Sequence, residues 1–272
     1  MEWPKLKNII ILILVLTNLC LFLLVMDREG RNAQLQSQSR LEAIQFLRDH
    51  DVELDEEQIP KTVEVTALRV ERELEEEVLL ARRLLKGEVT VTALGGGVYR
   101  YENAHGWLQL HGDGTFQAQF APGTWPIGRS AEQSALEVLE QLEYSGRVLS
   151  HRGNTVVLEQ TQDGAPLFLL RVNVQWEDGG ITALSEGRRL MGTAQPVEQQ
   201  QELSVSTALL EFHTQMDARG YVYSGIDRIE QGYVTQTALE GVTALAPAWQ
   251  IHTDTGVYRL NLLDASLSSV EN

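Results

Sequence analysis

The side chains that could do chemistry are scattered along this chain. The six histidines stand far apart, as His50, His105, His111, His151, His213 and His252. The sequence contains neither the G-x-S-x-G motif of a serine nucleophile nor the H-E-x-x-H motif of a zinc protease. The single cysteine, Cys20, lies in an apolar run, so no exposed thiol is expected. We therefore expect no enzymatic activity, no catalytic residues and no cofactor.

His105 and His111 are the strongest candidates for a metal site, because they flank Trp107 in an alternating segment. Residues six positions apart in a regular strand point to the same face. A zinc site needs at least three protein ligands, and the sequence shows no third one nearby. We therefore predict no metal site. The glycines at residues 95–97 precede a strand rather than a helix, which indicates a turn and not a phosphate-binding loop.

The first thirty residues predict a membrane anchor. Residues 9–26 form an uncharged apolar run of 18 residues, which as a helix would cover ~27 Å of a hydrocarbon core. Lys5 and Lys7 precede the run, and positive charge is retained on the cytoplasmic side. The alternative, a cleaved signal peptide, normally has a shorter apolar stretch and a small-residue cleavage site. We therefore predict a single-pass protein of the cell membrane, with a cytoplasmic N-terminus and extracellular C-terminal domains.

The charge balance excludes one large class of partners. The chain has 22 basic and 38 acidic residues, for a net charge of −16. Such a surface repels nucleic acid, so we expect no nucleic-acid binding. With its one cysteine at position 20, the rest of the chain has no disulfide to form and must be stabilised by its core.

The pattern beyond the apolar run predicts an α+β fold. Amphipathic helices are expected at residues 71–85, 130–144 and 205–218. Short alternating segments separated by glycine turns predict antiparallel strands between them. We expect helices packed on antiparallel β-sheets in two similar units, without a parallel βαβ crossover, after a single transmembrane helix. The predicted parts are a cytoplasmic tail (1–8), a transmembrane anchor (9–26), a polar stalk (27–40), and two extracellular α+β domains (41–121 and 129–272).

One polar side chain interrupts the apolar run. Asn18 has amide groups that lipid cannot satisfy, and such an amide often bonds to a second helix. Helical spacing places other apolar residues on its face. We hypothesise that this face binds partner transmembrane helices and consists of Leu14, Val15, Asn18, Leu21, Phe22 and Val25. A single polar residue tolerated in lipid is the simpler alternative.

Several segments resemble the YycI family. They are the N-terminal MEWPKLKN, the helix-to-turn segment AIQFLRDHDVELDEEQIP, the glycine-turn strands YRYENAHGWLQLHGDGTF and the C-terminal LAPAWQIHTDTGVYRLNLLDA. The resemblance extends over essentially the whole chain, and the longer YycH family shares the same topology. It implies a non-catalytic regulator of an envelope-sensing two-component system in Gram-positive bacteria. The implied partners are a YycH-like regulator and the sensor histidine kinase YycG (also called WalK), with an effect on cell-wall metabolism.

Two other functions remain open from the sequence. An extracellular ligand-sensing module would have a sizeable apolar pocket with converging polar groups. An envelope hydrolase would bring dispersed histidines and carboxylates together in space.

Overall fold

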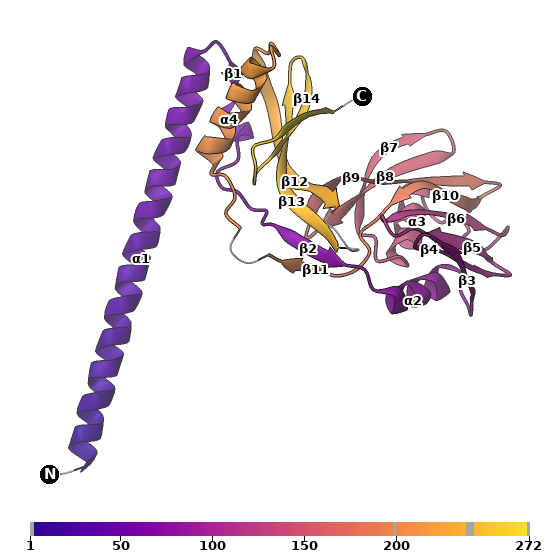
Figure 1. The fold of residues 1–272 in the computed structure, drawn as a ribbon, viewed down its shortest axis with the longest axis horizontal. Helices are drawn as coiled ribbons and strands as arrows, with labels where there is room; N and C mark the ends of the chain where they lie inside the picture. Colours follow the sequence, from indigo (N-terminus) through magenta and orange to yellow (C-terminus); the bar gives the residue numbers. More distant parts are fainter. Residues whose placement is uncertain (1–2, 198–199, 238–241, 271–272) are drawn as a thin grey trace.

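The computed structural model describes residues 3–197, 200–237 and 242–270, with the backbone alone for residues 3–13, 20 and 23–31. Its longest element is a single helix of 47 residues that extends far beyond the β-rich body (Figure 1). The described helices are α1 (Trp3–Asp49), the 3₁₀ turn η1 (Glu56–Gln58), α2 (Leu74–Leu84), α3 (Ala131–Glu140) and α4 (Val205–Ala218).

The described strands fall into two groups along the chain. The first nine are β1 (Glu53–Leu54), β2 (Leu68–Glu71), β3 (Thr90–Gly95), β4 (Val98–Asn103), β5 (Gly106–Leu110), β6 (Thr115–Phe120), β7 (Gly146–Arg152), β8 (Thr155–Gln162) and β9 (Ala165–Glu177). The others are β10 (Gly180–Arg188), β11 (Ala194–Pro196), β12 (Gly225–Thr237), β13 (Val242–Thr253), β14 (Gly256–Asn261) and β15 (Leu267–Val270).

These strands form one large mixed sheet, which corrects the predicted fold class. Its main path runs β11-β2-β13-β12-β9-β10-β6-β5-β4-β3. Most pairs are antiparallel, but β12 pairs in parallel with both β1 and β9. Two separate antiparallel units were predicted from the glycine turns that separate the alternating segments. The parallel pairing of β9 with β12 joins strands about sixty residues apart, so no local pattern encodes it.

Local sequence explains the helix bounds. The side chain of Ser130 accepts a hydrogen bond from the backbone N–H of Gln133 and caps α3. Ser204 caps α4 in the same way, through the N–H of Thr207. Serine is a favoured N-cap because its hydroxyl satisfies an N–H that the first turn leaves free. The predicted bounds of the helix at residues 205–218 are confirmed.

The body contains two hydrophobic cores. The first lies between α4, the end of α1 and strands β12 to β15, and includes Ile44, Leu47, Leu209, Phe212, Trp249, Ile251 and Leu260. The second lies between α2, α3 and the strands around β6, β8 and β9, and includes Leu80, Leu84, Val138, Leu139, Leu108, Leu158 and Val174. Each core draws residues from both sides of residues 121–129, and the predicted domain limits stay a prediction.

The described part of the chain contains no helix that is both long enough and apolar enough to cross a lipid bilayer. This finding contradicts the predicted transmembrane anchor over residues 9–26 and the predicted single-pass localisation. A bilayer span needs about 20 consecutive apolar residues.

Strand β9 is shared by the two cores. Leu167 and Leu170 belong to the first core, whereas Val172 and Val174 belong to the second. Leu169, which lies between the two residues of the first core, has a φ of 78° and is exposed. A positive φ is unfavourable for a side chain such as leucine, so the surrounding sheet must hold this bend in place.

The contact between β9 and β12 depends on a glycine. A Cβ atom added at Gly232 would lie 2.4 Å from the carbonyl oxygen of Pro166 and 2.8 Å from the ring of Phe168. Backbone atoms cannot move aside as a flexible side chain can. We predict that Gly232→Ala lowers the free energy of unfolding by about 1–3 kcal/mol, as overpacking does. Urea denaturation of the full chain measures the loss.

Gly87→Ala is the matched control. A Cβ atom at Gly87 meets only the side-chain nitrogen of Asn103, at 3.7 Å, which is an ordinary contact. This variant is expected to unfold at the urea concentration of the wild type. Equal stability of Gly232→Ala and Gly87→Ala would contradict the role assigned to the close β9–β12 contact.

Candidate functional site

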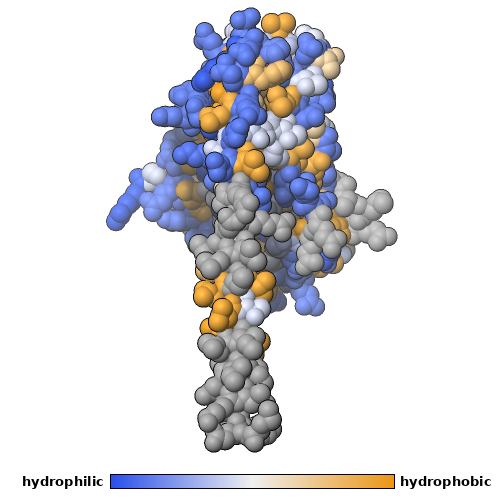
Figure 2. Space-filling model, turned by 90° about the vertical axis from the view of Figure 1, so that its left-hand side faces the viewer, coloured by the Kyte–Doolittle hydropathy of each residue, from blue (hydrophilic) through white to orange (hydrophobic). Residues whose placement is uncertain are grey.

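Helix α1 places the six residues that the sequence singled out on one continuous helix. Leu14, Val15, Asn18, Leu21 and Phe22 are all exposed, and Phe22 retains 60% of its accessible surface. Val25 lies in the same helix, but its side chain is outside the described residues. Figure 2 shows the described apolar residues on the helix beneath the polar body. The structure thus brings these residues onto one exposed segment and not into a pocket.

Exposure alone does not distinguish the predicted face from the rest of the helix. Leu16 lies on the other side of α1 and is exposed to a similar degree. Asn18 does distinguish the predicted face, because Val15, Asn18 and Phe22 follow the alternating three- and four-residue steps of a helix–helix seam and place one amide within that seam. An asparagine within such a seam specifies the register of the two helices at some expense in stability. The arrangement is suited to binding another helix.

The C-terminal end of α1 is fixed to the body. Ala43, Ile44 and Leu47 pack into the first core against α4. Arg40, only 7% exposed, donates hydrogen bonds from Nε to the carbonyl oxygen of Pro60 and from Nη2 to that of Ile59, both at 3.0 Å. A buried guanidinium needs such partners to offset its lost hydration. Arg40 therefore sets the direction in which α1 leaves the body.

Sequence reasoning missed this role, since residues 27–40 were interpreted as a polar stalk. Arg40 stands among exposed polar residues, and its partners lie sixteen to twenty residues later in the chain. The backbone oxygen of Glu56 accepts from Nη2 at 2.7 Å, and its carboxylate pairs with Nη1 at 3.2 Å. A loop that returns to the helix cannot be inferred from the helix sequence.

Two open grooves lie where α1 meets the body. One, of about 570 Å³, runs between α1 and α4 and is lined by Ser39, Glu42, Ala43, Phe46, Ser206, Leu210 and Thr214. The other, of about 740 Å³, lies at the start of α4 and includes Lys61, Thr66, Glu202, Ser204 and Thr207. Their linings mix hydroxyl, amide and aliphatic groups. They differ from the enclosed apolar cavity that a ligand-sensing module usually contains.

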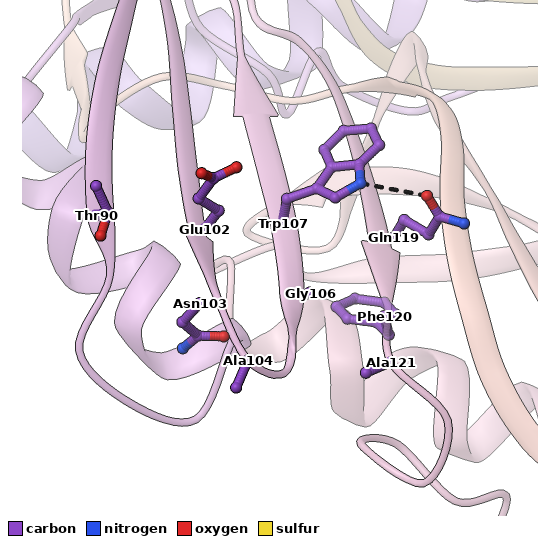
Figure 3. Close-up of a pocket in the computed structure, with 9 residues that line it drawn as sticks. All are labelled: Thr90, Glu102, Asn103, Ala104, Gly106, Trp107, Gln119, Phe120 and Ala121. Carbon is purple, nitrogen blue, oxygen red and sulfur yellow. Dashed lines mark hydrogen bonds between the residues drawn. The ribbon is translucent and has the colours of Figure 1, made fainter.

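Trp107 marks a third surface feature, on the sheet of β3 to β6. Glu102, Trp107 and Gln119 are cross-strand neighbours on one face, and they line a shallow pocket of about 520 Å³ (Figure 3). The indole Nε1 of Trp107 donates to Oε1 of Gln119 at 3.2 Å. The guanidinium of Arg100 lies 4.4 Å from the ring centre, within the range of a cation–π interaction. The ring is thus held as a half-buried aromatic surface.

The histidines are distributed over several elements. His105 and His111 lie at opposite ends of β5, and the ring of His111 contacts the amide of Gln109 at 3.0 Å. Among the residues that the structure describes, no three His, Cys, Asp or Glu side chains are grouped to hold a metal ion. His50 and His213 do meet, with ring centres 5.4 Å apart, where α1 contacts α4. Sequence reasoning did not pair them, because they come from distant helices.

Comparisons with known proteins do not assign a family. No family model and no curated protein matches the chain. Among solved structures, the chain is similar to an uncharacterized protein from Eubacterium rectale ATCC 33656, at 12% identity over 81% of this chain and 90% of that chain, with a TM-score of 0.48. It is also weakly similar to the C-terminal domain of Bacillus megaterium YpeB, at 10% identity over 75% of this chain and 100% of that one, with a TM-score of 0.33. Both likenesses are distant.

The meeting of His50 and His213 predicts a pH-sensitive joint between α1 and α4. Burial, and then the nearby His50, lower the pKa of His213 below its ordinary value of 6.5, while Asp217 opposes the shift. The Nδ1 atom of His213 also contacts the hydroxyl of Tyr223 at 3.0 Å. The folded state therefore favours the neutral form of His213. The contribution of His213 to the free energy of unfolding is complete above pH 6.5 and is lost as the pH falls below that value.

We predict that His213→Asn reduces the loss of unfolding free energy when the pH is lowered from about 7 to about 5. Asparagine keeps a polar group near the Tyr223 hydroxyl but does not titrate. Urea denaturation at the two pH values gives the measurement, and His105→Asn, at an exposed turn, is the control. An equal pH dependence in wild type and His213→Asn would show that this joint does not respond to protonation.

Proposed function

We propose that this protein is a non-catalytic regulator that acts by binding a helix of a partner protein through α1. The observation that carries the proposal is the exposed apolar segment between Leu14 and Phe22, on a helix that extends beyond the body. An apolar helix surface of this kind is stable in water only when another apolar surface covers it. The body of this chain does not reach that segment (Figure 1).

The proposed partners are a sensor histidine kinase of the YycG (WalK) type and a YycH-like regulator. This part of the proposal rests on the resemblance of several segments to the YycI family. In this view the chain adjusts the kinase, and through it cell-wall metabolism. Asn18 supports a specific contact. Its amide would be buried when a partner helix covers this face, and a buried amide needs a hydrogen-bond partner, which favours one register of the two helices.

A ligand-binding module is the second candidate function. The groove of about 740 Å³ at the start of α4 is the observation in its favour, since it is lined by Lys61 and several hydroxyl groups. Helix α1 borders the same groove through Gln36. A ligand there would touch both the helix and the body.

We predict that Asn18→Leu and Phe22→Ala reduce recovery of the partner proteins severalfold after cross-linking in the source cells and purification of the tagged full chain. Phe22→Ala removes buried apolar area from the seam, and Asn18→Leu removes the group that sets its register. Leu16→Ala is the matched control. At about 100° per residue, Leu16 lies on the side of α1 opposite to the predicted face.

Two results would contradict the proposal. One is the recovery of neither a histidine kinase nor a YycH-like protein with the wild type. The other is an equal loss of partner from Leu16→Ala and Phe22→Ala, since the predicted face would then have no special role. Circular dichroism of each variant checks that the β-rich body remains folded.

A further inference from the structure

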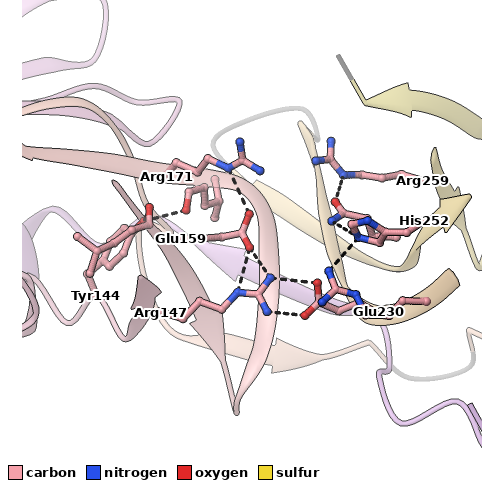
Figure 4. A network of polar contacts seen from close by, with 11 residues as sticks. Tyr144, Arg147, Glu159, Arg171, Glu230, His252 and Arg259 are labelled. Atoms are coloured by element: carbon pink, nitrogen blue, oxygen red, sulfur yellow. Dashed lines mark hydrogen bonds and ion pairs between the residues drawn. The ribbon is translucent and has the colours of Figure 1, made fainter. Parts of the chain in front are cut away.

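Two rows of polar and charged side chains face each other where the two cores meet. The first row crosses β7, β8 and β9 and consists of Arg147, Glu159 and Arg171, which are successive cross-strand partners. The second crosses β12, β13 and β14 and consists of Glu230, Gln250 and Arg259. Figure 4 shows the two rows approaching from opposite sides.

At one end the two rows are joined by ion pairs. The Nη2 atom of Arg147 donates to Glu159 at 2.7 Å and to Glu230 at 3.1 Å. The side chain of Glu159 is only 2% exposed, and it also accepts from Nε of Arg171 at 3.3 Å. Arg147 lowers the pKa of Glu230 and so keeps that carboxylate ionised. Positive charge therefore meets negative charge at this end.

At the other end, two arginines face each other. Arg171 and Arg259 extend toward each other from opposite sides (Figure 4). Arg259 is only 6% exposed, and its one hydrogen bond to a described residue runs from Nε to Oε1 of Gln250 at 3.1 Å. Its Nη2 atom is buried and has no partner among the described residues. The guanidinium also lies 5.5 Å from the ring centre of Phe168.

Among the described residues, no carboxylate pairs with Arg259 at this end. Burial, and then the nearby Arg171, lower the pKa of Arg259. A buried guanidinium without full hydrogen bonding is unfavourable, and a second cation beside it adds repulsion. Arg228 contacts His252 at 3.1 Å in the same neighbourhood, and Asp227 also lies near His252, so four arginines accompany three carboxylates in a chain of net charge −16.

We propose that Arg171 and Arg259 bind a compact oxyanion, either a phosphate or a carboxylate group, at the junction of the two cores. Two guanidinium groups offer paired N–H donors that match the oxygen atoms of such a group. The bound oxyanion supplies a negative charge to the two arginines, as Glu230 supplies one to Arg147 at the other end. The Nη2 atom of Arg259 gains an acceptor and the repulsion between the arginines is relieved.

The test measures thermal stability and binding of the full chain at constant ionic strength. Sodium phosphate or sodium acetate replaces sodium chloride stepwise, and isothermal titration calorimetry gives the dissociation constant. A ligand that binds only the folded state raises the melting temperature in a saturable way. We expect phosphate or acetate to raise it beyond chloride, and the more effective anion distinguishes a phosphate from a carboxylate ligand.

The variants assign the effect to the two arginines. Arg171→Gln and Arg259→Gln are expected to weaken binding by about tenfold or more, because each removes a charge-assisted donor pair. Arg152→Gln, at the exposed end of β7, makes the same change in net charge and should bind like the wild type. Arg171 is partly exposed, so its variant tests the proposal even if Arg259→Gln fails to fold.

Three results would overturn the proposal. The wild type could show no stabilisation by phosphate or acetate beyond chloride. Arg171→Gln could bind the effective anion as tightly as the wild type. Arg152→Gln could lose binding as strongly as Arg171→Gln, which would assign the effect to overall charge and not to this pair.

Discussion

Strand β9 is the element on which the rest of the body depends. One of its edges pairs with β8, while the other pairs with β12 near its start and with β10 near its end. The two cores therefore share one strand, with Leu167 and Leu170 in the first core and Val172 and Val174 in the second. Because only two residues of β9 pair with β12, the close approach at Gly232 and the ion pairs of Arg147 carry much of the connection.

The sequence predicted the local elements well and the connection between them poorly. Hairpin turns and the helix at residues 205–218 follow from glycine positions, serine caps and apolar spacing, all of which act within a few residues. The parallel contact of β9 with β12 joins distant segments, and nothing in either strand specifies its partner. The alternation at residues 63–67 is typical of a strand, yet no strand forms there, and the segment instead packs Val65 into the first core.

The candidate sites also differ in whether they depend on local sequence or on contacts between distant segments. The helical placement of Leu14 to Phe22 follows from the sequence of one segment, and their role as a binding face stays a prediction. Arg40 was not, since its partners arrive from a later loop. The facing rows of Arg171 and Arg259 were also hidden, although each residue is plain in the sequence. Only the register of six strands places Arg147, Glu159 and Arg171 in one line and Glu230 and Arg259 in the other.

The described contacts link α1 to the junction of the cores without a break. Ile44 and Leu47 pack against α4, whose Phe212 lies 6.1 Å from the ring of Tyr258 on β14. Arg259 follows Tyr258 on that strand and points the other way, toward β9. Arg40 anchors the end of α1 to the carbonyl oxygens of Ile59 and Pro60. Strand β14 carries the Nη2 atom of Arg259 that has no partner among the described residues, so an oxyanion at the proposed site would bind the strand that packs against α4, and α4 packs against α1.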